Sequence, residues 1–198
     1  MKSQREKIEQ TISNHLEVVA SLNGVCGDVL EILVERTEAA LRAGGKICFF
    51  GNGGSAADAQ HLATEFVVRY TRERAALASI AFTTDTSALT AAGNDFGFES
   101  IFARQVEALC RPDDVVVGIS TSGNSPNVEA GLAEAKKMGA LTVLFTGKTG
   151  GEKAKAEDRV DLILAAPSDV TARVQECHLL AGHILCDLVE ETFASERK

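Results

Sequence analysis

Apolar runs of strand length alternate with amphipathic stretches along most of this chain. The runs lie at 46–50, 77–82, 114–119, 141–146 and 160–164. Helical patterns separate them at 55–69, 86–92, 98–110, 126–138 and 149–155, and a long last helix is predicted over 169–194. Because the strands are apolar almost throughout, this alternation predicts a five-stranded parallel sheet with helices on both faces, a three-layer α/β sandwich. Right-handed crossovers then place the loops that follow the strands at one edge of the sheet.

An additional pair of amphipathic helices is predicted before the first strand, over 2–22 and 27–43. The first of them carries an apolar stripe at spacings of three and four, formed by Ile8, Ile12, Leu16 and Val19. This stripe has two interpretations, which the pattern leaves open. It packs against another subunit, or it is buried on its own domain.

The composition is that of one ordinary globular domain. The chain has 198 residues, 45% of them hydrophobic and 24% charged, without an internal repeat or a Pro/Ser-rich linker. We therefore expect a single domain over 1–198, with helices over 1–43 for packing and oligomerisation and an α/β core over 44–198. A net charge of -8 argues against nucleic acid or an anionic membrane as the main partner. Five cysteines without a C-x-x-C pair, and no apolar leader or membrane-length apolar run, predict a cytoplasmic protein.

The loop Ser120-Thr-Ser-Gly-Asn-Ser125 follows the third strand and precedes a predicted helix. Its hydroxyls, together with the free N–H groups and partial positive charge of a helix start, suit a phosphate. The loop contains no lysine, and the G-x-x-x-x-G-K-[ST] pattern of nucleotide hydrolases is absent. A sugar phosphate is therefore favoured, and the alternative is an ordinary polar turn that caps the helix.

A second loop of this kind, Gly51-Asn-Gly-Gly-Ser55, follows the first strand. Its glycines let the backbone turn sharply and approach a ligand closely, and Ser55 is either an N-cap or a hydroxyl ligand. Two such loops at the carboxyl ends of parallel strands point to one ligand crevice.

Candidate acid–base and metal-binding side chains lie on two predicted helices. His61 and Glu65 are four residues apart and share one helix face, which suits a metal, an acid–base pair or a plain surface contact. In the last helix, Gln175 and His183 project within about 80° of each other. His178 projects about 140° from His183, so one face cannot aim both histidines at one point, and His178 is expected in the core.

Two other polar positions have less definite interpretations. Asn94 and Asp95 belong to a predicted polar turn, where they either bind sugar hydroxyls or cap the helix over 98–110. His15 has no evident partner on the first helix and is assigned a structural role.

Four motifs together resemble the sugar isomerase (SIS) domain and, within it, the sedoheptulose 7-phosphate isomerase family. They are Gly51-Asn-Gly-Gly-Ser-Ala-Ala-Asp-Ala-Gln-His61 through Glu65, Gly93-Asn-Asp-Phe-Gly97, Gly118-Ile-Ser-Thr-Ser-Gly-Asn-Ser125 and Arg173-Val-Gln-Glu-Cys-His178. The resemblance implies interconversion of D-sedoheptulose 7-phosphate and D-glycero-D-manno-heptose 7-phosphate, the entry to heptose for lipopolysaccharide and some surface glycans. It also implies a homotetramer with active sites shared between subunits, and one zinc ion per subunit.

The resemblance assigns a role to each matching residue. The phosphate would be held by Ser55, Ser120, Thr121, Ser122 and Ser125. The sugar would be lined by Asn52, Gly53, Gly54, Asn94 and Asp95, with contacts from Glu65 and Gln175. Zinc would be held by His61, Glu65, Gln175 and His183. Glu65 and His183 also match the proposed acid–base pair, in which Glu65 moves the carbon proton and His183 serves the carbonyl oxygen.

A binding protein of the same fold is the alternative. Some SIS proteins bind the bacterial replication initiator and lack isomerase activity. In that branch the positions of Glu65 and His183 carry other residues, whereas both are intact here. The isomerase is therefore the favoured function.

Overall fold

The computed structural model describes residues 2–156 and 159–195. A parallel sheet with strand order β2-β1-β3-β4-β5 forms its centre. The strands are β1 (Ile47–Gly51), β2 (Ser79–Ala81), β3 (Val115–Ile119), β4 (Leu141–Gly147) and β5 (Leu162–Ala166). The register aligns Gly51 at the end of β1 with Ile119 at the end of β3, so the two polar loops leave the sheet side by side. The predicted three-layer fold is confirmed.

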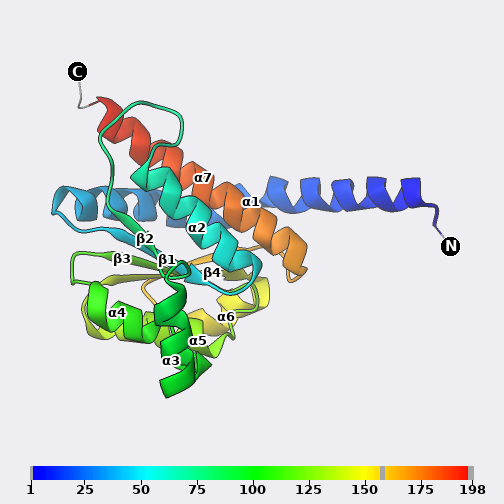
Figure 1. Ribbon diagram of the computed structural model, residues 1–198. Coiled ribbons are helices and arrows are strands. Elements are labelled where there is room, and N and C mark those ends of the chain that lie inside the picture. Colours follow the sequence, from blue (N-terminus) through cyan, green and yellow to red (C-terminus); the bar gives the residue numbers. More distant parts are fainter. Residues whose placement is uncertain (1, 157–158, 196–198) are drawn as a thin grey trace.

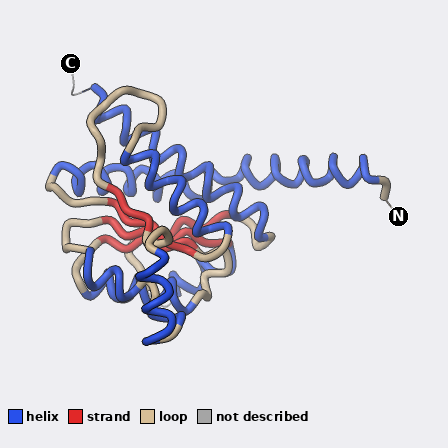
Figure 2. The backbone as a smooth tube through the Cα atoms, in the orientation of Figure 1, coloured by secondary structure: helices blue, strands red, loops and turns tan. Residues whose placement is uncertain are grey.

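Helices cover both faces of the sheet (Figures 1 and 2). One face carries α1 (Gln4–Arg42), α2 (Gly54–Val67) and α7 (Thr171–Ser195). The other carries α3 (Thr86–Phe96), the short 3₁₀ turn η1 (Phe98–Ser100), α4 (Ala103–Leu109), α5 (Pro126–Lys137) and α6 (Lys148–Ala156). Successive side chains of a strand point to opposite faces of the sheet, so each strand contributes to the two hydrophobic cores between the sheet and its helices. Phe49 packs in one core and Phe50 in the other.

The N-terminal helical pair was predicted wrongly, because α1 is one helix from Gln4 to Arg42. Gly24 in the expected break at 23–26, and Gly27 directly after it, cost only about 1 kcal/mol each in a helix. Leu22, Cys26 and Leu30 are buried on the body of the protein, and this continuous contact holds the helix through the glycines. A capping box of Ser3 and Glu6 closes its first turn.

The first half of α1 projects away from the body (Figure 1). Ile8, Ile12 and Leu16 are 55%, 55% and 61% exposed, whereas Val19 packs partly against the core. Burial of the stripe on its own domain is therefore wrong for three of its four members. None of the helices in the described part of the chain has both the length and the apolar character to cross a bilayer.

Several other boundaries differ from the sequence prediction. The helix over 98–110 is split into η1 and α4, and β5 begins two residues later than expected. A third difference is that α3 continues to Phe96, so Asn94 and Asp95 lie in its last turn rather than in a loop.

Candidate functional site

The glycine loop turns directly from β1 into α2. Gly53 adopts a positive φ of 56°, a conformation that favours glycine, and it occupies the N-cap position of α2. Ser55 is therefore inside the first turn rather than the cap, and it is 4% exposed. A Cβ at Gly54 would lie 2.3 Å from the side-chain nitrogen of Gln175, so the amide of Gln175 rests directly on the start of α2.

The serine loop leaves β3 beside the glycine loop. Its Gly123 also has a positive φ, 66°. The hydroxyls of Ser120 and Ser125 converge at 3.0 Å, although they come from opposite ends of the loop. Ser125 is the N-cap of α5 but makes no capping bond with its side chain, which leaves its hydroxyl available to a ligand.

A pair of amides joins the two loops. Asn52 and Asn127 exchange two hydrogen bonds of 2.8 Å, each side chain donating one and accepting one. Asn127 is 2% exposed at the start of α5. The side chain of Asn52, predicted to line the sugar, therefore has a second role that the sequence did not indicate.

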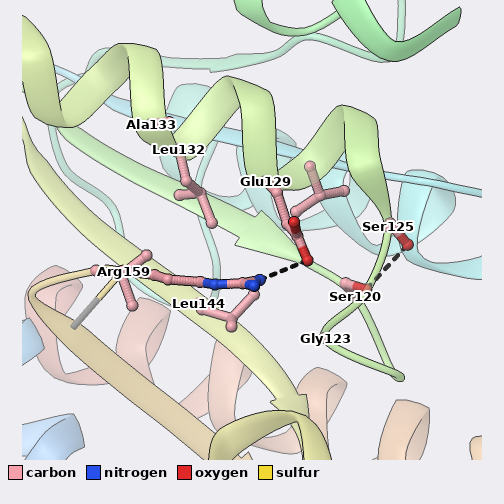
Figure 3. A pocket seen from close by; sticks show the side chains of 10 residues that line it. Ser120, Gly123, Ser125, Glu129, Leu132, Ala133, Leu144 and Arg159 are labelled. Carbon is pink, nitrogen blue, oxygen red and sulfur yellow. Dashed lines mark hydrogen bonds and ion pairs between the residues drawn. The ribbon is translucent and has the colours of Figure 1, made fainter. Parts of the chain in front are cut away.

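A cavity of about 340 Å³ lies between α5 and β4 next to the serine loop (Figure 3). Ser120, Gly123 and Ser125 line one end, and an ion pair of 2.6 Å between Glu129 and Arg159 crosses its middle. Its other walls are apolar side chains of α5 and β4, together with Val160. Apolar walls and a guanidinium already paired with a carboxylate do not suit a phosphate, so the phosphate is better placed at the hydroxyls and N–H groups of the loop itself.

Three of the predicted acid–base and metal-binding side chains form a run of contacts between α2 and α7, with His61 in the middle. The Nε2 atoms of His61 and His183 are 2.7 Å apart, although the residues are 122 positions apart in the chain. Glu65 Oε1 lies 3.5 Å from His61 Nε2 and is the more buried partner, at 18% side-chain exposure against 44%. Two imidazoles and a carboxylate are a donor set that zinc prefers.

Close packing of the two helices makes this cluster. A Cβ at Gly182 would lie 2.4 Å from Leu62 Cδ2, so glycine beside His183 lets α7 touch α2. Gln175, the fourth predicted ligand, lies eight residues before His183, about 12 Å along the helix axis, with its amide against Gly54. One copy of the chain thus groups His61, Glu65 and His183, and it places Gln175 beside the glycine loop.

Asn94 and Asp95 stand apart from these contacts. Both side chains are exposed in the last turn of α3, and Asn94 donates to Asp95 at 2.7 Å. Their contact with sugar stays a prediction.

The two other histidines have structural surroundings. His178 is fully buried, with Nε2 3.0 Å from the carbonyl oxygen of Thr146, and burial lowers its pKa to about 4. This confirms the prediction that His178 belongs to the core. His15, expected to lack a partner, has one, because its Nδ1 lies 2.7 Å from Glu176 Oε2.

Another group of possible ligand atoms lies near the starts of β1 and β3, at the edge of the sheet opposite the two polar loops. Across residues 2–156 and 159–195, Cys48, Cys110 and Asp114 form the one cluster of three such side chains within 4.8 Å of one another. The ammonium of Lys46 lies 2.6 Å from Asp114 and supplies a positive charge there already. All three cluster residues are at most 1% exposed, so the group resembles a core contact more than an entry point for an ion.

Comparison with known proteins assigns the chain to a family. Residues 6–147 match the SIS domain model. Phosphoheptose isomerase of Paramagnetospirillum magneticum is 53% identical over 94% of this chain and 96% of its own length. That of Aquifex aeolicus is 58% identical over 77% of this chain and 78% of its own length. The structure of phosphoheptose isomerase from Neisseria gonorrhoeae superposes with a TM-score of 0.87 at 39% identity, covering 96% of this chain and all of that one. The chain belongs to the phosphoheptose isomerase family of SIS-domain proteins.

Proposed function

We propose that this protein is an aldose–ketose isomerase that converts D-sedoheptulose 7-phosphate to D-glycero-D-manno-heptose 7-phosphate. The observation that carries the proposal is that His61 contacts both Glu65 on its own helix α2 and His183 on α7, close to the phosphate-type loops. The reaction moves one proton between adjacent carbons through an enediol. It needs a base at carbon and a group that serves the oxygen.

Glu65 is the carbon base in this proposal, and His183 exchanges a proton with the carbonyl oxygen. A histidine suits the oxygen because its ordinary pKa lies near neutrality. Each residue should contribute roughly 10²–10⁴-fold to turnover, the usual effect of a positioned acid or base.

The phosphate is assigned to Ser55, Ser120, Thr121, Ser122 and Ser125. Two features support this: the hydroxyls of Ser120 and Ser125 converge, and the latter makes no capping bond. The sugar is assigned to Asn52, Gly53, Gly54, Asn94, Asp95 and Gln175.

Zinc is the metal that we propose for His61, Glu65 and His183, with Gln175 as the fourth expected ligand. The fit is partial: His61 contacts both His183 and Glu65, but the three ligand atoms do not all lie within 4.8 Å of one another. Nitrogens on one tetrahedral zinc are roughly 3.3 Å apart, so the two imidazoles, now 2.7 Å apart, would separate slightly. Zinc at this place would supply Lewis acidity to a sugar carbonyl.

We also propose a single SIS domain that assembles as a homotetramer through the projecting half of α1. Its exposed Ile8, Ile12 and Leu16 need a cover, and a second copy offers the same stripe. A cytoplasmic location is proposed as well, since all five cysteines are unpaired and buried. The heptose would serve lipopolysaccharide or another surface glycan.

Turnover of sedoheptulose 7-phosphate by metal-stripped and zinc-supplied protein tests the proposal, with NMR following the aldose phosphate. Activity restored by zinc supports the enzyme and the metal together. Equal activity in both states keeps the enzyme and removes the catalytic metal. No turnover in either state, with tight binding to the replication initiator, would replace the isomerase by the adaptor.

A further inference from the structure

The end of α2 is held by a buried arginine from the segment that follows it. Arg74 Nη2 donates to the carbonyl oxygen of Glu65 at 2.6 Å, and Nη1 donates to that of Phe66 at 2.9 Å. Because α2 ends at Val67, these carbonyls are among the last four, which have no partner within the helix. A cation there also complements the helix dipole. The Arg74 side chain, only 1% exposed, is therefore attached to the backbone of Glu65 itself.

A buried carboxylate on α7 holds the same segment. Glu190 lies seven residues after His183, close to two helical turns, and so on the same side of α7. Its oxygens accept hydrogen bonds from the backbone N–H groups of Tyr70, Thr71 and Arg72, at 2.6 to 2.7 Å. Burial would raise the pKa of Glu190, but these hydrogen bonds lower it below the ordinary value, so the carboxylate is charged.

The two buried charges meet. Arg74 Nε lies 3.3 Å from Glu190 Oε1, and both side chains are at most 1% exposed. Tyr70, whose N–H rests on Glu190, places its ring 5.4 Å from the ring of His183. A chain of contacts therefore runs from the backbone of Glu65 through Arg74 and Glu190 to the helix that carries His183.

We infer that Arg74 and Glu190 are positioning residues, which hold Glu65 and His183 at the separation that proton transfer needs. This inference rests on the proposed roles of Glu65 and His183. Neither Arg74 nor Glu190 is expected to touch the sugar. They act by fixing the end of α2 against α7, with a charge pair that is costly to break because it is buried.

A second ion pair between α7 and the segment that follows α2 provides a matched control. Asp187 of α7 pairs with Arg72 of the same segment at 2.5 Å, but these side chains are 44% and 39% exposed. Exposed ion pairs contribute little to the stability of the folded protein. Asp187→Asn therefore removes an ion pair of the same elements without removing the buried contact.

The first test is steady-state kinetics of Glu190→Gln, which keeps the side-chain size and removes the charge. We expect kcat to fall about 100-fold, the usual effect of a misplacement of about 1 Å. KM should stay within about threefold of the wild-type value, because the serine loop connects β3 to α5, away from the Arg74–Glu190 pair. Asp187→Asn should retain kcat within about twofold.

The second readout is the distance between the Nε2 atoms of His61 and His183 in crystal structures of wild type and Glu190→Gln. The variant should show them more than about 1 Å farther apart. Arg74→Lys keeps the positive charge but not both hydrogen bonds to the carbonyl oxygens. Its kcat should lie between the values of the wild type and of Glu190→Gln. If Glu190→Gln does not fold, Arg74→Lys takes its place in both measurements. Wild-type kcat together with wild-type spacing in the variants would overturn the inference. A wild-type protein without turnover would rule out the proposed function. The distance between the Nε2 atoms of His61 and His183 would then still test whether Arg74 and Glu190 position the two helices.

Discussion

Asn52 and Asn127 connect the glycine loop to the serine loop through two amide hydrogen bonds of 2.8 Å. The sugar and phosphate ends of the proposed site are thus held by one contact between α5 and the turn before α2. Since Asn127 is almost fully buried, loss of its amide leaves Asn52 without its partner.

Asn127→Ala should lower the free energy of unfolding by about 1–3 kcal/mol, the cost of an unsatisfied buried polar group. It should also raise KM for sedoheptulose 7-phosphate more than it lowers kcat, because it loosens the binding loops and not the acid–base pair. Urea unfolding and steady-state kinetics measure the two effects. If the amides act as a pair, Asn52→Ala should add little to Asn127→Ala, and fully additive losses would contradict this.

Gly182→Ala should destabilise the protein by about 1–3 kcal/mol through overpacking against Leu62. The sign of this change in stability is informative, because replacing glycine by alanine at an open helical position stabilises a protein by up to about 1 kcal/mol. Chemical denaturation measures the change. In a Leu62→Ala background the clash is absent and the same substitution should no longer destabilise; an equal loss in both backgrounds would exclude the clash.

Stability should fall as the pH drops from 6.5 towards 4, because of His178. Burial lowers its pKa from 6.5 to about 4, so the folded protein binds fewer protons here than the unfolded chain. The stabilisation is complete above pH 6.5 and is lost as the pH falls through this window, up to about 3 kcal/mol in total. Urea midpoints between pH 4 and 7 measure it. His178→Gln should flatten this part of the profile, and an unchanged slope would assign the effect to other groups.

Ile12→Lys combined with Leu16→Lys should reduce the molar mass of the assembly measured by light scattering. Both side chains are more than half exposed in one copy, so the helical content in circular dichroism should not change. Ser13→Lys on the same projecting half of α1 is the control and should leave the assembly intact. A wild-type protein that is already monomeric would contradict the proposed tetramer.

The sequence determined the sheet, the two anion-type loops and the helices that carry His61, Glu65 and His183. It could do so because apolar runs and glycine turns report local burial and local backbone geometry, which depend on neighbouring residues in the chain. The five strands, two of which begin two residues later than predicted, and the core location of His178 follow from this.

Only the tertiary structure decided how these parts meet. The 2.7 Å contact of His61 with His183 depends on the approach of α2 to α7, which Gly182 permits through a partner 120 positions away. The continuous α1 depends in the same way on burial against the body of the protein. Asn127, Arg74 and Glu190 are polar residues that a sequence pattern places at the surface, and they are buried because partners distant in the chain satisfy them. Such pairings are invisible to periodicity, since packing between elements, and not spacing along the chain, provides the energy.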